Sequence, residues 1–200
     1  MKIIGTILIS VIVFLTMNSL IPSVKDAQIY NTTVRLHVLA DSDSERDQEL
    51  KLKVRDALLE EIADYNAKSK AEALLKMEEN KENLTKIAEE VLEKEGCDRE
   101  VSIEIGNEKY PTRYYEDFAL PAGNYTSVRV IIGSGSGQNW WCVLYPPLCT
   151  GNAIEFDDEY CVDVGLTKDQ YNLITRANGE YKIKFKLLEM TSQAFGFNYD

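Results

Sequence analysis

The stretch WWCVLYPPLC, residues 140–149, decides how the second half of the chain folds. A half-buried strand alternates apolar and polar residues, whereas here every side chain up to Leu148 is large, apolar or ring-locked. Pro146 and Pro147 each lack a backbone N–H and fix φ, so they end any strand that reaches them. We therefore predict a strand over residues 140–145, followed by extended chain toward Cys149.

Four cysteines, Cys97, Cys142, Cys149 and Cys161, allow three complete disulfide pairings. We favour a bond between Cys142 and Cys149, because a short loop stiffened by two prolines brings its ends together. Closing this ring contributes roughly 2 to 3 kcal/mol in the chain-entropy model. Free buried thiols remain the alternative, since strand geometry can point the two side chains apart. Zinc is disfavoured by the wide cysteine spacing and by the presence of a single histidine, His37.

The N-terminal segment is typical of an exported protein. Residues 3–21 carry no charge, follow Lys2, and form an apolar run of 19 residues. This length spans a bilayer and also fits the apolar region of a signal peptide, so cleavage stays open. We expect residues 1–27 to be a signal peptide or an N-terminal membrane anchor, and residues 28–200 to form one exported domain in which disulfides are permitted.

The chain is strongly acidic, with a formal net charge of −11. Nucleic acids and anionic lipid surfaces both present phosphate, which such a chain repels. The composition therefore argues against either as a partner, and we expect membrane contact only through residues 3–21.

Residues 33–40 (TVRLHVLA) predict a strand with one buried face, because Arg35 and His37 alternate with apolar residues. The acidic and serine-rich run at residues 41–47 follows directly. Its acids could ring a calcium ion, but Arg46 stands at the glycine position of an EF-hand loop. We interpret the run as the capped start of a helix instead.

The remaining periodicity predicts an α+β fold: a single domain with an antiparallel sheet and two to three N-terminal-half helices packed against it. Helices are expected at residues 45–65 and, broken near Asn80, within residues 69–95. Strands are expected at residues 101–106, 125–133 and 139–145. The last two flank the glycine-rich residues 133–137, which we interpret as the flexible tip of a hairpin. This glycine run lacks the residues of a dinucleotide or P-loop motif.

Two blocks of the sequence resemble a known family. VRLHVLADSDSERDQELKLKVRDALL (34–59) and YPTRYYEDFALPAGNYTSVRVIIGSGSGQNWWCVLYPPLC (110–149) are similar to the two signatures of the stage II sporulation protein R family. Asp41 stands where the family pattern has asparagine, and residues 150–180 match no motif of the family.

The resemblance implies a signalling protein that is made in the forespore and exported into the space between forespore and mother cell. There it would activate a membrane-embedded aspartic protease, which processes the precursor of the early mother-cell sigma factor. It also implies no catalytic centre, no cofactor and no small-molecule substrate for this chain.

A protein ligand of this kind needs anchors for its partner, and aromatic side chains commonly supply the core of an interface. The predicted contact residues are Trp140, Trp141, Tyr145, Pro146, Pro147, Tyr114 and Phe118. Successive strand residues point to opposite faces, so one of the two tryptophans packs inward.

Two other functions compete with this interpretation. An extracytoplasmic cysteine hydrolase would use Cys142 as nucleophile and His37, the only histidine, as base. A module that binds a small ligand would need a pocket lined by Trp140, Tyr110 and Tyr145, which no sequence spacing supports.

Overall fold

The computed structural model describes residues 10, 29–115, 117–148 and 158–175. The predicted leader, apart from residue 10, and the C-terminal tail lie outside these ranges. Among the described residues, no helix has the length and apolar character needed to cross a bilayer.

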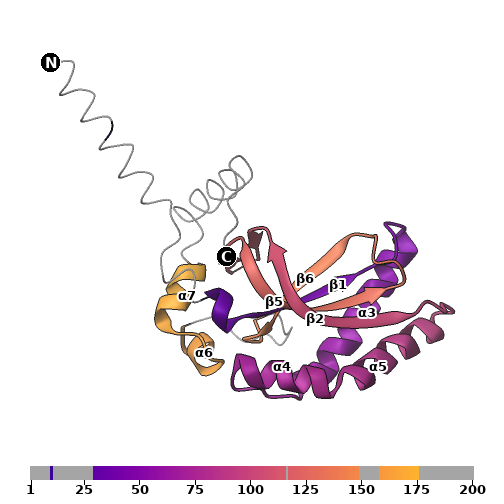
Figure 1. Cartoon of the computed structure of the whole chain (residues 1–200), viewed down its shortest axis with the longest axis horizontal. Coiled ribbons are helices and arrows are strands. Elements are labelled where there is room, and N and C mark those ends of the chain that lie inside the picture. Colours follow the sequence, from indigo (N-terminus) through magenta and orange to yellow (C-terminus); the bar gives the residue numbers. More distant parts are fainter. Residues whose placement is uncertain (1–9, 11–28, 116, 149–157, 176–200) are drawn as a thin grey trace.

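A mixed four-stranded sheet forms the centre of the molecule, in the order β2-β5-β1-β6 (Figure 1). Its strands are β1 (Val34–Leu39), β2 (Val101–Tyr110), β5 (Gly123–Ile132) and β6 (Asn139–Tyr145). β1 runs parallel to β5 and antiparallel to β6, while β2 and β5 are antiparallel. Two short strands, β3 (Arg113–Tyr114) and β4 (Ala119–Leu120), pair separately. The single-domain α+β prediction is confirmed, with one parallel pairing in a mostly antiparallel sheet.

The predicted hairpin between β5 and β6 is wrong, because β1 lies between these two strands. All six residues of β1 are buried, so the expectation of one buried face is also wrong. A strand covered on both faces belongs at the centre of a sheet, where it pairs on both sides. The glycine-rich link at residues 133–138 therefore passes the end of β1 instead of forming a tight turn.

Three helices cover one face of the sheet (Figure 1). They are α3 (Glu45–Ala63), α4 (Lys70–Glu79) and α5 (Lys81–Lys94), which confirms the predicted helices and their break. Asn80 ends α4 and begins α5. The apolar stripes of these helices pack on alternate residues of the strands, among them Leu36, Val38, Val128 and Val130. This layer is the main hydrophobic core.

A second, smaller core lies on the opposite side of the sheet. Tyr110, Tyr125 and Val143 project there from the strands and meet Ile29, Phe118 and Leu120. The short helices α6 (Asp158–Asp163) and α7 (Lys168–Thr175) add Cys161, Leu173 and Ile174 to this core. Trp141 packs against this second core and stays half-buried.

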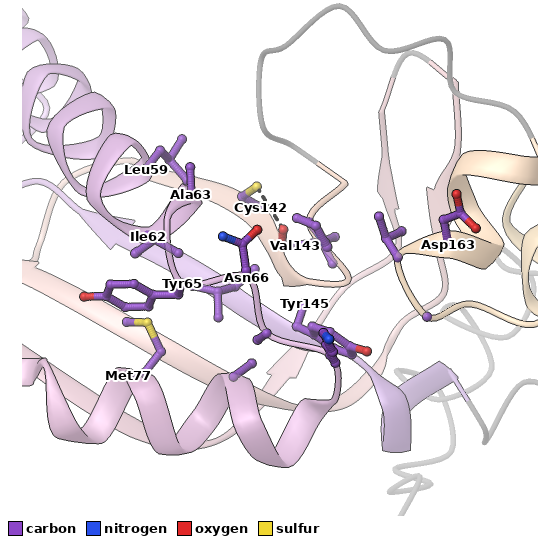
Figure 2. A pocket seen from close by; sticks show the side chains of 17 residues that line it. Leu59, Ile62, Ala63, Tyr65, Asn66, Met77, Cys142, Val143, Tyr145 and Asp163 are labelled. Carbon is purple, nitrogen blue, oxygen red and sulfur yellow. Dashed lines mark hydrogen bonds between the residues drawn. The ribbon is translucent and has the colours of Figure 1, made fainter.

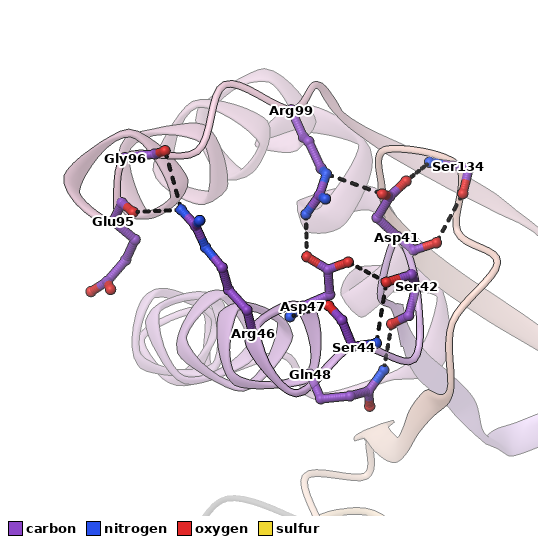
Figure 3. Close-up of polar contacts among 10 residues, drawn as sticks. All are labelled: Asp41, Ser42, Ser44, Arg46, Asp47, Gln48, Glu95, Gly96, Arg99 and Ser134. Carbon is purple, nitrogen blue, oxygen red and sulfur yellow. Dashed lines mark hydrogen bonds and ion pairs between the residues drawn. The ribbon is translucent and has the colours of Figure 1, made fainter.

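A polar network ties the start of α3 to the 133–138 link (Figure 3). The Ser44 side chain caps α3 by accepting the Asp47 N–H at 3.2 Å. Asp47 also accepts hydrogen bonds from the Ser42 hydroxyl and the Arg99 guanidinium. Arg99 pairs with Asp41 at 3.0 Å, and Asp41 accepts the Ser134 N–H at 2.6 Å. The helix-cap interpretation is confirmed, and an arginine lies between the two carboxylates that a calcium loop would need.

Candidate partner-recognition surface

The two tryptophans of β6 point to opposite faces of the sheet. Trp140 is paired with Val38 and packs against the main core, with the Arg55 guanidinium 4.9 Å from its ring centroid. Trp141 is paired with His37 on the other face. Both tryptophans are half-buried: Trp140 packs against the main core, and Trp141 packs against the second core on the opposite side of the sheet. We call the side away from α3–α5 the Trp141 face.

The other predicted contact residues differ in their exposure. Tyr145, Pro146 and Phe118 are buried, so they shape the surface without presenting their own side chains. Pro147 is half-buried. Tyr114 on β3 is 47 % exposed, which makes it the most accessible aromatic residue of the predicted set.

A stack of three side chains surrounds Trp141. Its ring lies 3.8 Å from the His37 ring at an interplanar angle of 18°. The Arg113 guanidinium lies 4.5 Å from the Trp141 centroid, and Tyr110 meets the indole edge-on at 4.6 Å. Cation–π and stacking contacts of this kind hold an aromatic side chain in one orientation. Trp141 is half-buried, so part of it stays accessible.

His37 is held by a carboxylate on the far strand of the sheet. Its Nδ1 lies 3.1 Å from Glu108 Oε2, although β5 lies between β2, which carries Glu108, and β1, which carries His37. Burial lowers the pKa of His37, and Glu108 opposes this effect only in part. The imidazole is therefore neutral near neutral pH and donates from Nδ1 to Glu108.

Arg35 is a fully buried cation on the same face, with 0 % exposure. Its Nε donates to the Cys142 carbonyl at 3.1 Å and its Nη2 to the Tyr115 hydroxyl at 2.7 Å. Its guanidinium also lies over the rings of Tyr110 and Tyr125, at 4.3 and 5.1 Å. Among the described residues it has no carboxylate partner. Burying a charge without an oppositely charged partner lowers the stability of the fold by several kcal/mol, on the order of magnitude known for buried ions.

Sequence reasoning missed Arg35, Arg113 and Arg129 as parts of one cluster. Arg129 pairs with Glu104 at 3.2 Å, and its Nε lies 3.9 Å from Glu108. The available signal was Arg35 itself, a cation inside a strand that is otherwise apolar apart from His37. Arg113 comes from a segment whose fold the sequence did not predict.

The proposed hydrolase pair is incompatible with the sheet. Cys142 is paired with Leu36 and packs into the main core, whereas His37 lies on the Trp141 face. The sheet thus separates the Cys142 sulfur from the imidazole that would activate it. Nucleophile and base must lie within hydrogen-bond reach, so these two residues form no catalytic pair.

The structure describes three of the four cysteines. Cys97 is a free thiol and Cys161 is buried in the second core, while Cys142 is buried and disulfide-bonded. Cys149 lies outside the described residues, so the 142–149 pairing stays a prediction.

A cavity of about 530 Å³ lies between the α3–α4 link and the end of β6 (Figure 2). Leu59, Ile62, Met77, Val143 and Tyr145 line it together with the α6–α7 link. Burial raises the pKa of Tyr65 at its edge to about 12. Of the three residues predicted to line a ligand pocket, Tyr145 does so, whereas Trp140 and Tyr110 do not line this cavity.

No metal site is present within the described part of the chain, where no three metal-binding side chains come together. The acids of the 41–47 run instead accept hydrogen bonds from Arg99, Ser42 and Ser134.

Comparison with known proteins identifies relatives of this domain. A family profile described as Stage II sporulation protein R matches residues 30–155. A protein of that name from Bacillus subtilis (strain 168) is 39 % identical over 123 residues, which cover 60 % of this chain and 55 % of the relative. The match thus spans about half of that relative's length. No solved structure matches the chain.

Proposed function

Because the chain belongs to the stage II sporulation protein R family, we propose that it is an exported forespore signal. In this proposal it enters the space between the forespore and mother-cell membranes and activates a membrane-embedded aspartic protease. The protease then processes the precursor of the early mother-cell sigma factor. The observation that carries the proposal is the family match, which covers β1 to β6 and all of α3–α5.

The chemistry of the described residues supports a ligand over an enzyme. Cys142 and His37 lie on opposite faces of the sheet, so the one catalytic pair suggested by the sequence is not assembled. Accessible aromatic side chains of the kind that anchor interfaces gather near β3 and β6, namely Tyr114 and Trp141. We propose that this region, at the edge of the Trp141 face, contacts the protease.

Export through residues 3–21 and a 142–149 disulfide belong to the same proposal. The space between the two membranes lies outside the reducing cytoplasm, which permits a disulfide there. The bond would brace the chain just after β6, close to Tyr145 and Pro146, and so fix the strand that carries Trp141.

Reconstitution in a heterologous host tests the function. The full chain, the candidate protease and the sigma-factor precursor are co-produced, and precursor cleavage is followed by immunoblot. We expect cleavage only when all three are present. Cleavage that proceeds equally well without this chain would rule out the signalling function.

A matched pair of variants locates the contact surface in the same assay. Tyr114 and Leu75 are both exposed large apolar residues, at 47 % and 58 %, but Leu75 lies on α4, on the other side of the sheet. Tyr114→Ala is expected to weaken cleavage, whereas Leu75→Ala is expected to leave it unchanged. Equal activity of both variants would place the contact elsewhere.

A further inference from the structure

Unsatisfied donors and acceptors collect around the Trp141 face. Among the residues that the structure describes, the buried side-chain atoms without a hydrogen-bond partner include Arg35 Nη1, His37 Nε2, Arg113 Nε and Arg129 Nε. Tyr65 Oη is the remaining one, and it lies on the helix side at the cavity. Buried polar atoms are normally paired, because an unpaired one costs about 1 to 3 kcal/mol. Arg129 Nε still lies 3.9 Å from a Glu108 oxygen, and His37 Nε2 is an acceptor when Nδ1 carries the proton, so within the described chain the donors of this cluster that lack a partner are Arg35 Nη1 and Arg113 Nε.

These atoms belong to one cluster. Arg113 lies over Trp141, which in turn stacks on His37. The charges of Arg113 and Arg129 both act on His37. The charges of Arg35 and Arg113 both act on Tyr115, to which Arg35 donates a hydrogen bond. The three guanidinium groups therefore surround the same side of the sheet.

The cluster carries more positive than negative charge. Its two carboxylates, Glu104 and Glu108, interact with Arg129 and His37. Within the described residues, Arg35 and Arg113 form no ion pair. This local excess of cations stands out in a chain with a net charge of −11.

We propose that Arg113, with Arg35 behind it and Trp141 beside it, binds a carboxylate in an acidic segment of the partner protease. This inference rests on the proposed function and names the chemistry of its contact. A guanidinium matches a carboxylate through two parallel hydrogen bonds, and an adjacent tryptophan supplies apolar contact area. The acidic remainder of the surface repels the same segment, so the cluster fixes where and in which orientation the partner docks.

Arg113 is the residue on which to test this, because it is half-buried and lies on the short strand β3, outside the four-stranded sheet. Arg46 is the matched control. It is an exposed arginine at the start of α3 that donates hydrogen bonds to the carbonyls of Glu95 and Gly96. Arg113→Glu, Arg113→Gln and Arg46→Glu are produced as full chains in the reconstituted cleavage assay, and the thermal unfolding of each purified variant is recorded.

We expect Arg113→Glu to lower precursor cleavage about tenfold or more, Arg113→Gln to lower it less, and Arg46→Glu to leave it unchanged. Arg113→Gln, which introduces no repulsive charge, keeps the test valid if Arg113→Glu does not fold. A second-site change of an acidic residue to lysine in an exported segment of the protease should restore cleavage by Arg113→Glu.

Two results would overturn the inference. The first is wild-type cleavage by a folded Arg113 variant, and the second is an equal loss for Arg113→Glu and Arg46→Glu, which would indicate a general charge effect. Both leave the proposed function standing. Absence of cleavage with the wild-type chain would instead overturn the proposed function and this inference with it.

Discussion

Replacement of Gly137 by alanine should destabilise the domain. Gly137 is buried in the link between β5 and β6, where its N–H donates to the Ala40 carbonyl at 2.9 Å. A Cβ atom at this position would lie 2.2 Å from the Ser42 backbone oxygen and 2.5 Å from the Ser42 carbonyl carbon. Both contacts are far inside van der Waals distance, and both involve backbone, so no side-chain rotation relieves them.

The loss of stability depends on which segment shifts to relieve the clash with Ser42. Either the link shifts away from Ser42, or the turn before α3 shifts, and the second movement disturbs the Ser42–Asp47–Arg99 contacts. Overpacking of this kind costs about 1 to 3 kcal/mol. For a domain of this size, about 2 kcal/mol corresponds to a fall of roughly 4 to 8 °C in Tm.

Gly106→Ala provides the control. Gly106 is exposed on the edge strand β2, and a Cβ atom there meets nothing within 4 Å. At a compatible site the change to alanine is neutral or slightly stabilising, by up to about 1 kcal/mol. Thermal unfolding followed by circular dichroism should therefore rank the proteins Gly106→Ala, wild type, Gly137→Ala. A Gly137→Ala variant as stable as Gly106→Ala would refute the close packing of the link on Ser42.

Three further predictions concern titration and the disulfide. Hydrogen bonds from Ser42 and Arg99 lower the pKa of Asp47 in the folded state. The ionised Asp47 therefore stabilises the fold above pH 3.8, and this contribution is lost as the pH falls through the lower pKa of the folded state. In urea unfolding measured at a series of pH values, Asp47→Asn should reduce the loss of stability on the acid side. Burial lowers the pKa of His37 in the folded state, so below pH 6.5 the unfolded chain takes up a proton that the folded chain does not. The free energy of unfolding should therefore fall as the pH drops below 6.5, and His37→Gln should remove this pH dependence in the same measurement. Under non-reducing conditions the exported form should show a Cys142–Cys149 bond by peptide mass analysis, and the double serine variant should lose about 2 to 3 kcal/mol of stability; detection of two free thiols at these positions would contradict this.

Local patterns of the sequence predicted the elements well. The four-residue spacing in residues 45–65 predicted α3, and Asn80 predicted the break between α4 and α5, because helix periodicity and capping depend on neighbours in sequence. The serine-rich start of α3 was predicted as a cap for the same reason. Pro146 correctly limited β6, which ends at Tyr145.

The pairing of the strands depends on distant residues, and here the prediction failed. Residues 125–133 and 139–145 are adjacent in sequence and were assigned to a hairpin, yet β1 lies between them. The error came from the composition of β1, because its alternating polar residues were interpreted as a face exposed to solvent. Arg35 is instead buried against the rings of Tyr110 on β2 and Tyr125 on β5. His37 is buried between Trp141 on β6 and the Glu108 carboxylate on β2. Alternation of polarity does not distinguish a solvated face from a buried polar one.

The central position of β1 also decides at which positions a substitution can affect signalling without affecting stability. Leu36 and Val38 build the main core from one face of this strand, while Arg35 and His37 support Trp141 from the other. A change in β1 therefore disturbs the core and the Trp141 face together, and a loss of signalling by such a variant is ambiguous. Arg113 and Tyr114 lie on the separate two-stranded sheet, from which Arg113 reaches the Trp141 ring. If the protease recognises this face, substitutions on β3 should reduce signalling while leaving the unfolding midpoint near that of the wild type.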